Sequence, residues 1–101
     1  PLICKCLLAY AHHMADVYRA IADPTRRQIL DLLAGGAEMT LFDICTRLLA
    51  AGTTSSRQAV SQHLAVLEEC DLVRTARVGR TKMHRMNPEP LREIVARWPL
   101  E

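Results

Sequence analysis

The sequence predicts a mainly helical fold that carries one β-hairpin near its C-terminal end. Half of the 101 residues are hydrophobic, only 4% are aromatic and only four are glycine, which favours helices around an aliphatic core. Apolar residues recur at helical spacing as far as Cys70. Between Leu72 and Met86 the pattern changes to two strand-like runs. A chain of this length has room for one core, so residues 1–101 are expected to form a single domain.

The first segment carries an apolar stripe whose spacings alternate between four and three residues, as expected for a helix that packs on another helix. Two interpretations of residues 1–13 remain open. They either extend the first helix or are an upstream or vector-derived leader, with the natural start at Met14. The stripe consists of Ile3, Leu7, Tyr10, Met14, Val17 and Ile21.

The second helix is expected to begin at Asp23-Pro24, where the aspartate accepts from free amides and proline fits the first turn. It should run to about Ala34 and end at Gly35-Gly36. Its predicted inward residues are Ile29, Leu30 and Leu33.

A third helix follows from Thr40, which forms a capping box with Asp43. The turn after it spans residues 50–54. The predicted inward face of this helix consists of Leu41, Ile44, Cys45, Leu48 and Leu49.

The helix over residues 56–70 is the element around which the chain is organised. Ser55 with Gln58 makes a second capping box, although Ser56 is an alternative cap. One face is apolar, and the opposite face carries amides, hydroxyls and one guanidinium. No acidic residue precedes Glu68. The inward residues are Val60, Leu64 and Leu67; the polar ones are Arg57, Gln58, Ser61 and Gln62.

A hairpin turning at Gly79-Arg80 comes next, and Asn87-Pro88 then starts a last helix that Pro99 stops. A lone hairpin is not stable by itself, so it must lean on the helices with its basic tip beside the polar helix. This order of elements is that of a winged helix-turn-helix. The apolar stripe of the last helix is Leu91, Ile94, Val95 and Trp98.

A polar helix of this kind suits the major groove of double-stranded DNA. Arginine can pair with guanine and glutamine with adenine, while the serine-rich turn and the helix start can hold phosphate. The net charge of +2 is too small to argue this alone, but residues 74–85 hold five cations and no acid. His63 is as well explained by packing as by phosphate contact. The predicted DNA contacts are Ser55, Ser56, Arg57, Gln58, Ser61, Gln62, His63, Arg77, Arg80 and Lys82.

At these motifs the sequence resembles the arsenical-resistance repressor (ArsR) family. Ala22 to Arg27 with Ile29-Leu30 is similar to the family's opening motif, and Ala59 to Leu64 with Leu67-Glu68 to its recognition helix. Gly79-Arg80 fits its wing, and the resemblance covers residues 16–98. It implies a homodimeric bacterial transcriptional regulator, usually a repressor.

The resemblance also implies a dimer interface between the first and last helices, made by Leu7, Tyr10, Met14, Val17, Leu91, Ile94, Val95 and Trp98. Two departures stand out. The turn over residues 50–54 is longer than usual by about five residues. Metal-sensing members place thiolates at the start of the third helix, where this chain has Thr40 and Phe42 and retains only Cys45.

The remaining patterns predict no metal site, no cofactor and no catalytic activity. Cys4 and Cys6 with His12-His13 are loosely spaced for a metal, and Cys45 and Cys70 lie on apolar helix faces, where thiols behave as small hydrophobes. Free thiols and the lack of a membrane-length apolar run favour a cytoplasmic protein. The sequence leaves the effector open. Two alternatives to a simple repressor are a metal- or thiol-responsive sensor and a winged helix that binds protein.

Overall fold

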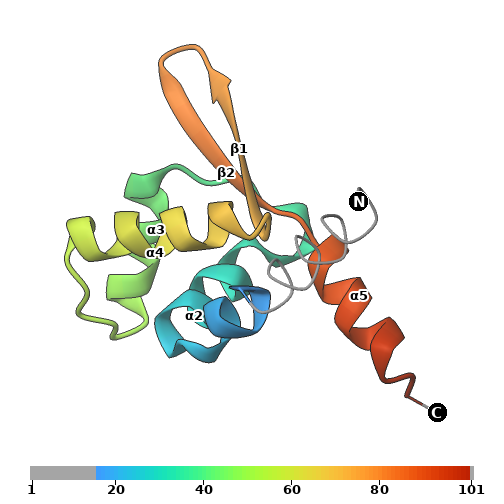
Figure 1. The fold of residues 1–101 in the computed structure, drawn as a ribbon. Helices are drawn as coiled ribbons and strands as arrows, with labels where there is room; N and C mark the ends of the chain where they lie inside the picture. Colours follow the sequence, from blue (N-terminus) through green and yellow to red (C-terminus); the bar gives the residue numbers. More distant parts are fainter. Residues whose placement is uncertain (1–15, 101) are drawn as a thin grey trace, which may run out of the picture.

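A computed structural model describes residues 16–100 and confirms the predicted winged helix-turn-helix. The predictions for Leu7, Tyr10 and Met14 lie outside this range. The elements are a helical segment over 16–22, α2 (Pro24–Leu33), the 3-10 turn η1 (Ala34–Gly36), α3 (Leu41–Ala50), α4 (Arg57–Glu69), β1 (Val73–Val78), β2 (Thr81–Met86) and α5 (Glu89–Arg97). Figure 1 shows α2, α3 and α4 gathered in one body, from which the hairpin and α5 project.

Side-chain caps set where the central helices begin. Asp23 accepts from the backbone N–H of Arg26, and Thr40 forms the predicted capping box with Asp43. At α4 the cap is Ser56, whose hydroxyl accepts from the backbone N–H of Ala59 at 3.1 Å. The capping box predicted for Ser55 is therefore wrong, because α4 begins one residue later than that pattern requires.

The long turn between α3 and α4 is well defined. Gly52 adopts a φ of +89°, which only glycine tolerates readily, and its N–H donates to Leu49. The N–H of Thr53 donates to Leu48, so the two bonds together make a Schellman motif. The hydroxyl of Thr53 then donates to the side chain of Gln28 on α2 at 2.9 Å, which pins the turn to the body.

The core lies where α2, α3 and α4 meet the base of the hairpin. Two expectations about it are wrong. Val17 was expected at a dimer interface, but its side chain has no exposed surface and belongs to the core of its own chain. Leu49 was placed on the inward face of α3, yet it is 68% exposed because it lies in the last turn, beside the loop. The buried aliphatic residues include Ile29, Leu30, Leu33, Ile44, Leu48, Val60, Leu64, Leu67 and Leu72.

The hairpin is joined to the helical body at its base. Val78 pairs with Thr81 around the two-residue turn, and Gly79 has the positive φ that such turns need. His84 of β2 exchanges both backbone hydrogen bonds with Met39, just before α3, and its ring Nδ1 lies 3.1 Å from the carbonyl oxygen of Met39. The base is therefore held, while the tip projects from the body (Figure 1).

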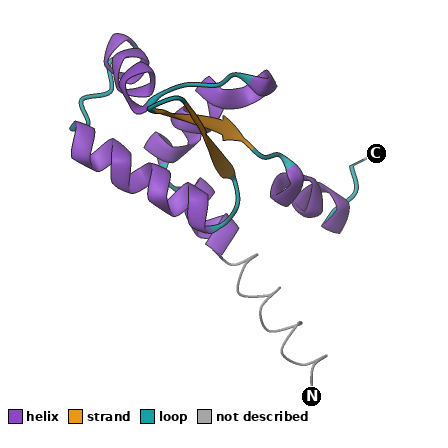
Figure 2. Ribbon diagram, turned by 90° about the horizontal axis from the view of Figure 1, so that it is seen from above, coloured by secondary structure: helices purple, strands orange, loops and turns teal. Residues whose placement is uncertain are grey.

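Helix α5 extends away from the body on the side opposite the hairpin tip (Figure 1). Figure 2, seen from above, also shows α5 apart from the other helices. Leu91 and Ile94 are half-buried against the core, whereas Val95 and Trp98 are largely exposed. The ring of Trp98, the residue that follows α5, lies 6.4 Å from that of Tyr18, so the end of α5 reaches the helical segment 16–22. Among the described residues, no helix combines the length and apolarity needed to cross a membrane.

Candidate nucleic-acid interface

The exposed face of α4 consists of Arg57, Gln58, Ser61 and Gln62, and all four side chains are solvent-exposed. The structure brings them together on the first two turns of the helix, as predicted. No hydrogen bond or ion pair joins these side chains to any other described residue. The first turn of α4 contains no acidic residue. The face thus offers amide, hydroxyl and guanidinium groups that are free to bind an external partner.

The opposite face of α4 is fixed in the core. Val60, Leu64 and Leu67 are between 0 and 2% exposed. Burying one such side chain contributes about 1.5–3 kcal/mol relative to leaving it in water. Because helical residues on opposite sides cannot move independently, the buried leucines determine where the exposed face points.

The start of α4 is suited to an anion. Helix N-termini present unpaired backbone N–H groups and a partial positive charge. Ser56 is exposed, Ser55 is half-buried, and Thr54 just before them is exposed. Arg57, in the first helical position, adds a full positive charge. Three hydroxyl groups, two of them on exposed residues, and one guanidinium therefore lie at or just before this helix start.

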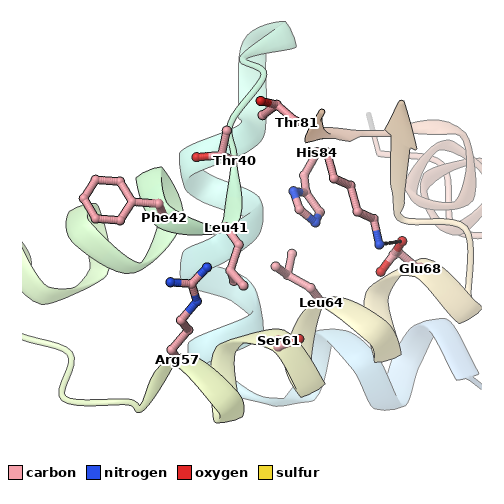
Figure 3. Close-up of a pocket in the computed structure, with 10 residues that line it drawn as sticks. Thr40, Leu41, Phe42, Arg57, Ser61, Leu64, Glu68, Thr81 and His84 are labelled. Carbon is pink, nitrogen blue, oxygen red and sulfur yellow. Dashed lines mark ion pairs between the residues drawn. The ribbon is translucent and has the colours of Figure 1, made fainter. Parts of the chain in front are cut away.

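A groove runs between α4 and the hairpin, which we call the α4–wing groove (Figure 3). It has a volume of about 320 Å³. Helix α4 lines it with every third or fourth residue, and the start of α3 and strand β2 form its other sides. Its lining residues are Thr40, Leu41, Phe42, Arg57, Ser61, Leu64, Glu68, Thr81, Lys82 and His84.

The cations of the hairpin differ in how they are held. Arg77 and Arg80 near the tip are exposed and pair with no other described residue. Lys82 lies 3.5 Å from the carboxylate of Glu68 on α4, so it links the hairpin to that helix across the groove. The dashed line at Glu68 in Figure 3 marks this ion pair. Arg74 makes two hydrogen bonds to Asp71, which raise the pKa of its guanidinium.

His63 is the predicted DNA contact whose surroundings differ most from the others. Its Nδ1 lies 3.2 Å from the guanidinium of Arg26 and 3.9 Å from the carboxylate of Asp23. The His63 side chain is 22% exposed. The backbone N–H of Arg26 is the main cause that lowers the pKa of Asp23, and the positive charge of the Arg26 guanidinium adds to it. His63 was explained equally well by packing within the fold or by contact with a DNA phosphate. Its contacts with Arg26 and Asp23 agree with packing within the fold.

The thiols of the described residues are Cys45, half-buried, and Cys70, buried. Burial raises the pKa of the Cys70 thiol, which disfavours the reactive thiolate. Among the described residues, no group of three or more histidine, cysteine or acidic side chains is close enough to hold a metal ion. Cys4, Cys6, His12 and His13 lie outside that range.

Sequence reasoning missed two features of this region. Glu68 was noted only as the first acid of the helix, yet it is the α4 partner of Lys82. Arg26 and Arg27 entered the sequence analysis only as part of the opening motif, yet their side chains donate mainly to backbone carbonyls. Partners of this kind leave no trace in the pattern of residue types.

Comparison with known proteins agrees with this geometry. A model of the helix-turn-helix domain matches residues 21–76. The chain is 39% identical to the HTH-type transcriptional regulator YuzN of Bacillus subtilis, over 81% of this chain and 90% of that protein. It is 36% identical to the transcriptional repressor SdpR of the same organism, over 86% and 89%. Fold and relatives together define a winged helix-turn-helix transcriptional regulator.

Solved structures indicate which family of winged helix-turn-helix regulators the chain resembles. An ArsR-like transcriptional regulator from Rhodococcus sp. RHA1 is 32% identical, with a TM-score of 0.76 over 89% of this chain and 77% of that one. A homodimeric winged helix-turn-helix DNA-binding domain from Mycobacterium bovis is 31% identical, with a TM-score of 0.66 over 93% and 87%. The chain belongs to the ArsR family of transcriptional regulators.

Proposed function

We propose that this regulator is a homodimeric repressor that binds a near-palindromic DNA operator. In this arrangement the α4 helices of two protomers enter successive major grooves, about 34 Å apart. The repressor name of SdpR and the dimer of the Mycobacterium bovis domain support the proposal. The observation that carries it is the exposed face of α4, whose polar groups have no partner among the described residues while the helix itself is fixed in the core.

Sequence discrimination is assigned to Arg57, Gln58, Ser61 and Gln62. A glutamine amide can both donate and accept, as the edge of adenine requires, and an arginine can donate twice to guanine. Each such pair provides roughly 1–3 kcal/mol of discrimination against a wrong base. Since α4 cannot rotate without exposing its leucines, these groups approach the bases in one orientation.

Phosphate binding is assigned to the helix start and the hairpin. Ser55 and Ser56 would donate their hydroxyls from the start of α4, and Arg77, Arg80 and Lys82 would contact the backbone or the adjoining minor groove. Contacts of this kind bind any sequence and weaken steeply with salt. They set the total affinity, whereas the exposed face of α4 sets the preference for one site.

The dimer interface is assigned to the apolar side of α5 together with the first helix. Val95 on α5 and Trp98 just after it are 56% and 58% exposed, and neighbouring exposed apolar side chains of this size are typical of an interaction surface. They adjoin the half-buried Leu91 and Ile94. Val17, which lies in the core, is no longer part of this set. Tyr10, Leu7 and Met14 remain predictions from the sequence.

The deciding experiment compares binding of operator and random DNA. The operator is first obtained by in-vitro selection, which also tests palindromy and half-site spacing. Gln62→Ala should weaken operator binding by roughly 1–3 kcal/mol per recognition contact and leave random DNA nearly unchanged. Glu69→Ala is the control, because Glu69 is exposed on α4 but lies at its far end. Equal losses on both DNAs would remove the base-reading role of Gln62, and no selected DNA at all would favour a protein-binding winged helix.

A further inference from the structure

Arg26 lies at the centre of a set of contacts that joins three elements. Its Nε donates to the carbonyl oxygen of Ala20 at 2.9 Å, and its Nη2 donates to that of Arg19 at 3.4 Å. Its Nη1 lies 3.2 Å from Nδ1 of His63 on α4. The guanidinium thus connects the end of the helical segment 16–22 to the side of the DNA-facing helix.

The donors and acceptors in this set can be assigned. A guanidinium can only donate, so Nδ1 of His63 must be the acceptor and carries no proton in this contact. The carbonyls of Arg19 and Ala20 belong to the last turn of their helix, where carbonyl groups lack partners within the helix. A planar fork with donors in fixed directions can serve such separated acceptors at once, which a lysine ammonium on a flexible stem cannot.

The next residue, Arg27, makes one of the two kinds of contact that Arg26 makes. Nη1 of Arg27 donates to the carbonyls of Ile21 and Ala22, at 2.9 and 3.0 Å, so Arg27 also binds the end of segment 16–22. Its side chain has no contact of this kind with α4. Arg26 and Arg27 therefore share the capping role and differ in the bond to His63, which makes Arg27 a matched control.

Segment 16–22 also lies close to the end of the last helix, because Tyr18 pairs with Trp98, the residue that follows α5. A chain of contacts therefore leads from the end of α5 to α4. It passes from Trp98 to Tyr18, along the end of segment 16–22 to Arg26, and from Arg26 to His63, the residue after Gln62. On α4, His63 lies between the buried Leu64 and the exposed Gln62. A bond to its ring therefore restricts rotation of the helix about its own axis.

We propose that Arg26 is a positioning residue for DNA recognition: it fixes the orientation of α4 against segment 16–22 through His63. This inference rests on the proposed function, because it concerns how the exposed face of α4 meets the bases. In this role His63 acts through its bond to Arg26 rather than by touching phosphate. The role predicts a change in discrimination, whereas a purely structural arginine would change stability alone.

Binding to selected operator and random DNA is measured for Arg26→Lys and Arg27→Lys, with thermal unfolding of both. Arg26→Lys should lower the ratio of operator to random affinity by about tenfold, the effect of one lost hydrogen bond to a charged group. Arg27→Lys should lower the unfolding temperature to a similar extent but leave that ratio unchanged. An equal fall in the ratio for both variants would overturn the proposal, as would no fall for Arg26→Lys.

Variants of His63 test the acceptor. His63→Asn keeps an oxygen acceptor near the position of Nδ1 and should retain the ratio, while His63→Leu should lower it as far as Arg26→Lys does. Combining Arg26→Lys with His63→Leu should cost no more than either change alone, because both remove one bond. Additive losses, or a loss with His63→Asn equal to that with His63→Leu, would refute the bond as the cause.

A measurement without DNA separates this inference from the proposed function. The ¹⁵N chemical shift of His63 Nδ1 should change in Arg26→Lys and stay constant in Arg27→Lys. An unchanged shift in Arg26→Lys would show that the bond does not form, whatever the DNA results. If the shift changes but the wild-type chain cannot tell operator from random DNA, the bond stands while the proposed function and the positioning role both fail.

Discussion

Helix α4 and the hairpin both present polar and basic groups to solvent, but they are held very differently. Helix α4 is buried along one face, with Val60, Leu64 and Leu67 at most 2% exposed, and is capped by Ser56. In the hairpin, Val73 and His84 are the buried strand residues, and both lie toward the base. From Arg74 to Thr81 every side chain is exposed.

Under the proposed function, this difference suits α4 and the hairpin to two separate tasks in DNA binding. Reading a base edge needs donors and acceptors in fixed positions, which a helix locked by its core provides. Binding phosphate needs positive charge within reach and tolerates movement. A rigid helix with few charges and a charged arm fixed only at its base meet these two requirements separately.

Removing one apolar side chain from each region should give the largest contrast. Leu67→Ala on α4 leaves a cavity in a fully buried site and should cost roughly 2–5 kcal/mol of unfolding free energy. Val78→Ala at the hairpin tip removes a side chain that is 64% exposed and should stay within about 0.5 kcal/mol. Chemical denaturation of the two variants measures both. Similar losses would mean that the hairpin tip packs against something that this structure of one chain does not show.

The sequence predicted the buried face of α4 well, because in this helix the spacing of apolar residues follows which side chains are buried. Every inward leucine of that helix is one that the 3.6-residue pattern selects. The same pattern failed at Leu49, since periodicity does not reveal where the neighbouring elements stop covering a helix. It failed at Val17 for the opposite reason, because a stripe that suits a partner helix equally suits the chain's own core.

Other features had no pattern from which to be predicted. Ser55 and Ser56 are adjacent and chemically equivalent, so only the backbone decides which one caps the helix. The bond between Arg26 and His63 joins residues 37 positions apart in the sequence, and the other acceptors of Arg26 are backbone carbonyls. The link between Lys82 and Glu68 likewise depends on how the hairpin leans over α4.

Charge removal at the hairpin tip should alter affinity without altering preference. Arg80→Ala should cost about 1.5 kcal/mol on both operator and random DNA, the lower end for a hydrogen bond to a charged group. The slope of log affinity against log salt should flatten by about 0.9 for each phosphate that the variant no longer neutralises. Fluorescence anisotropy over a series of salt concentrations measures both quantities.

The control for that experiment is Arg47→Ala. Arg47 is also exposed, but it lines a groove between α2 and α3 with Gln28, Asp31 and Leu32, away from the exposed face of α4. It carries the same charge, so a general electrostatic effect would appear in both variants. A salt slope that is unchanged in Arg80→Ala, or changed equally in Arg47→Ala, would contradict the phosphate role.

The cap of α4 offers a smaller and sharper test. Ser56→Ala should cost about 1 kcal/mol of unfolding free energy, because the N–H of Ala59 loses its acceptor. Ser55→Ala should cost much less, since Ser55 makes no capping bond in the structure. The denaturation midpoints of the two variants measure the difference. A larger loss for Ser55→Ala would restore the capping box predicted from the sequence.

The smallest effect is expected where the two regions meet. The Lys82 and Glu68 side chains are 50% and 29% exposed, so their ion pair should contribute less than about 1 kcal/mol. A double-mutant cycle of Lys82→Met and Glu68→Gln isolates this coupling energy in the free protein.

On DNA the two changes should differ, because Lys82→Met removes a predicted phosphate contact and Glu68→Gln removes an acid from the α4–wing groove. Weaker binding for Lys82→Met and equal or tighter binding for Glu68→Gln would show that the groove faces DNA. Equal losses from both changes would instead show that the pair acts by holding the hairpin against α4, so that the arm depends on the helix for its position.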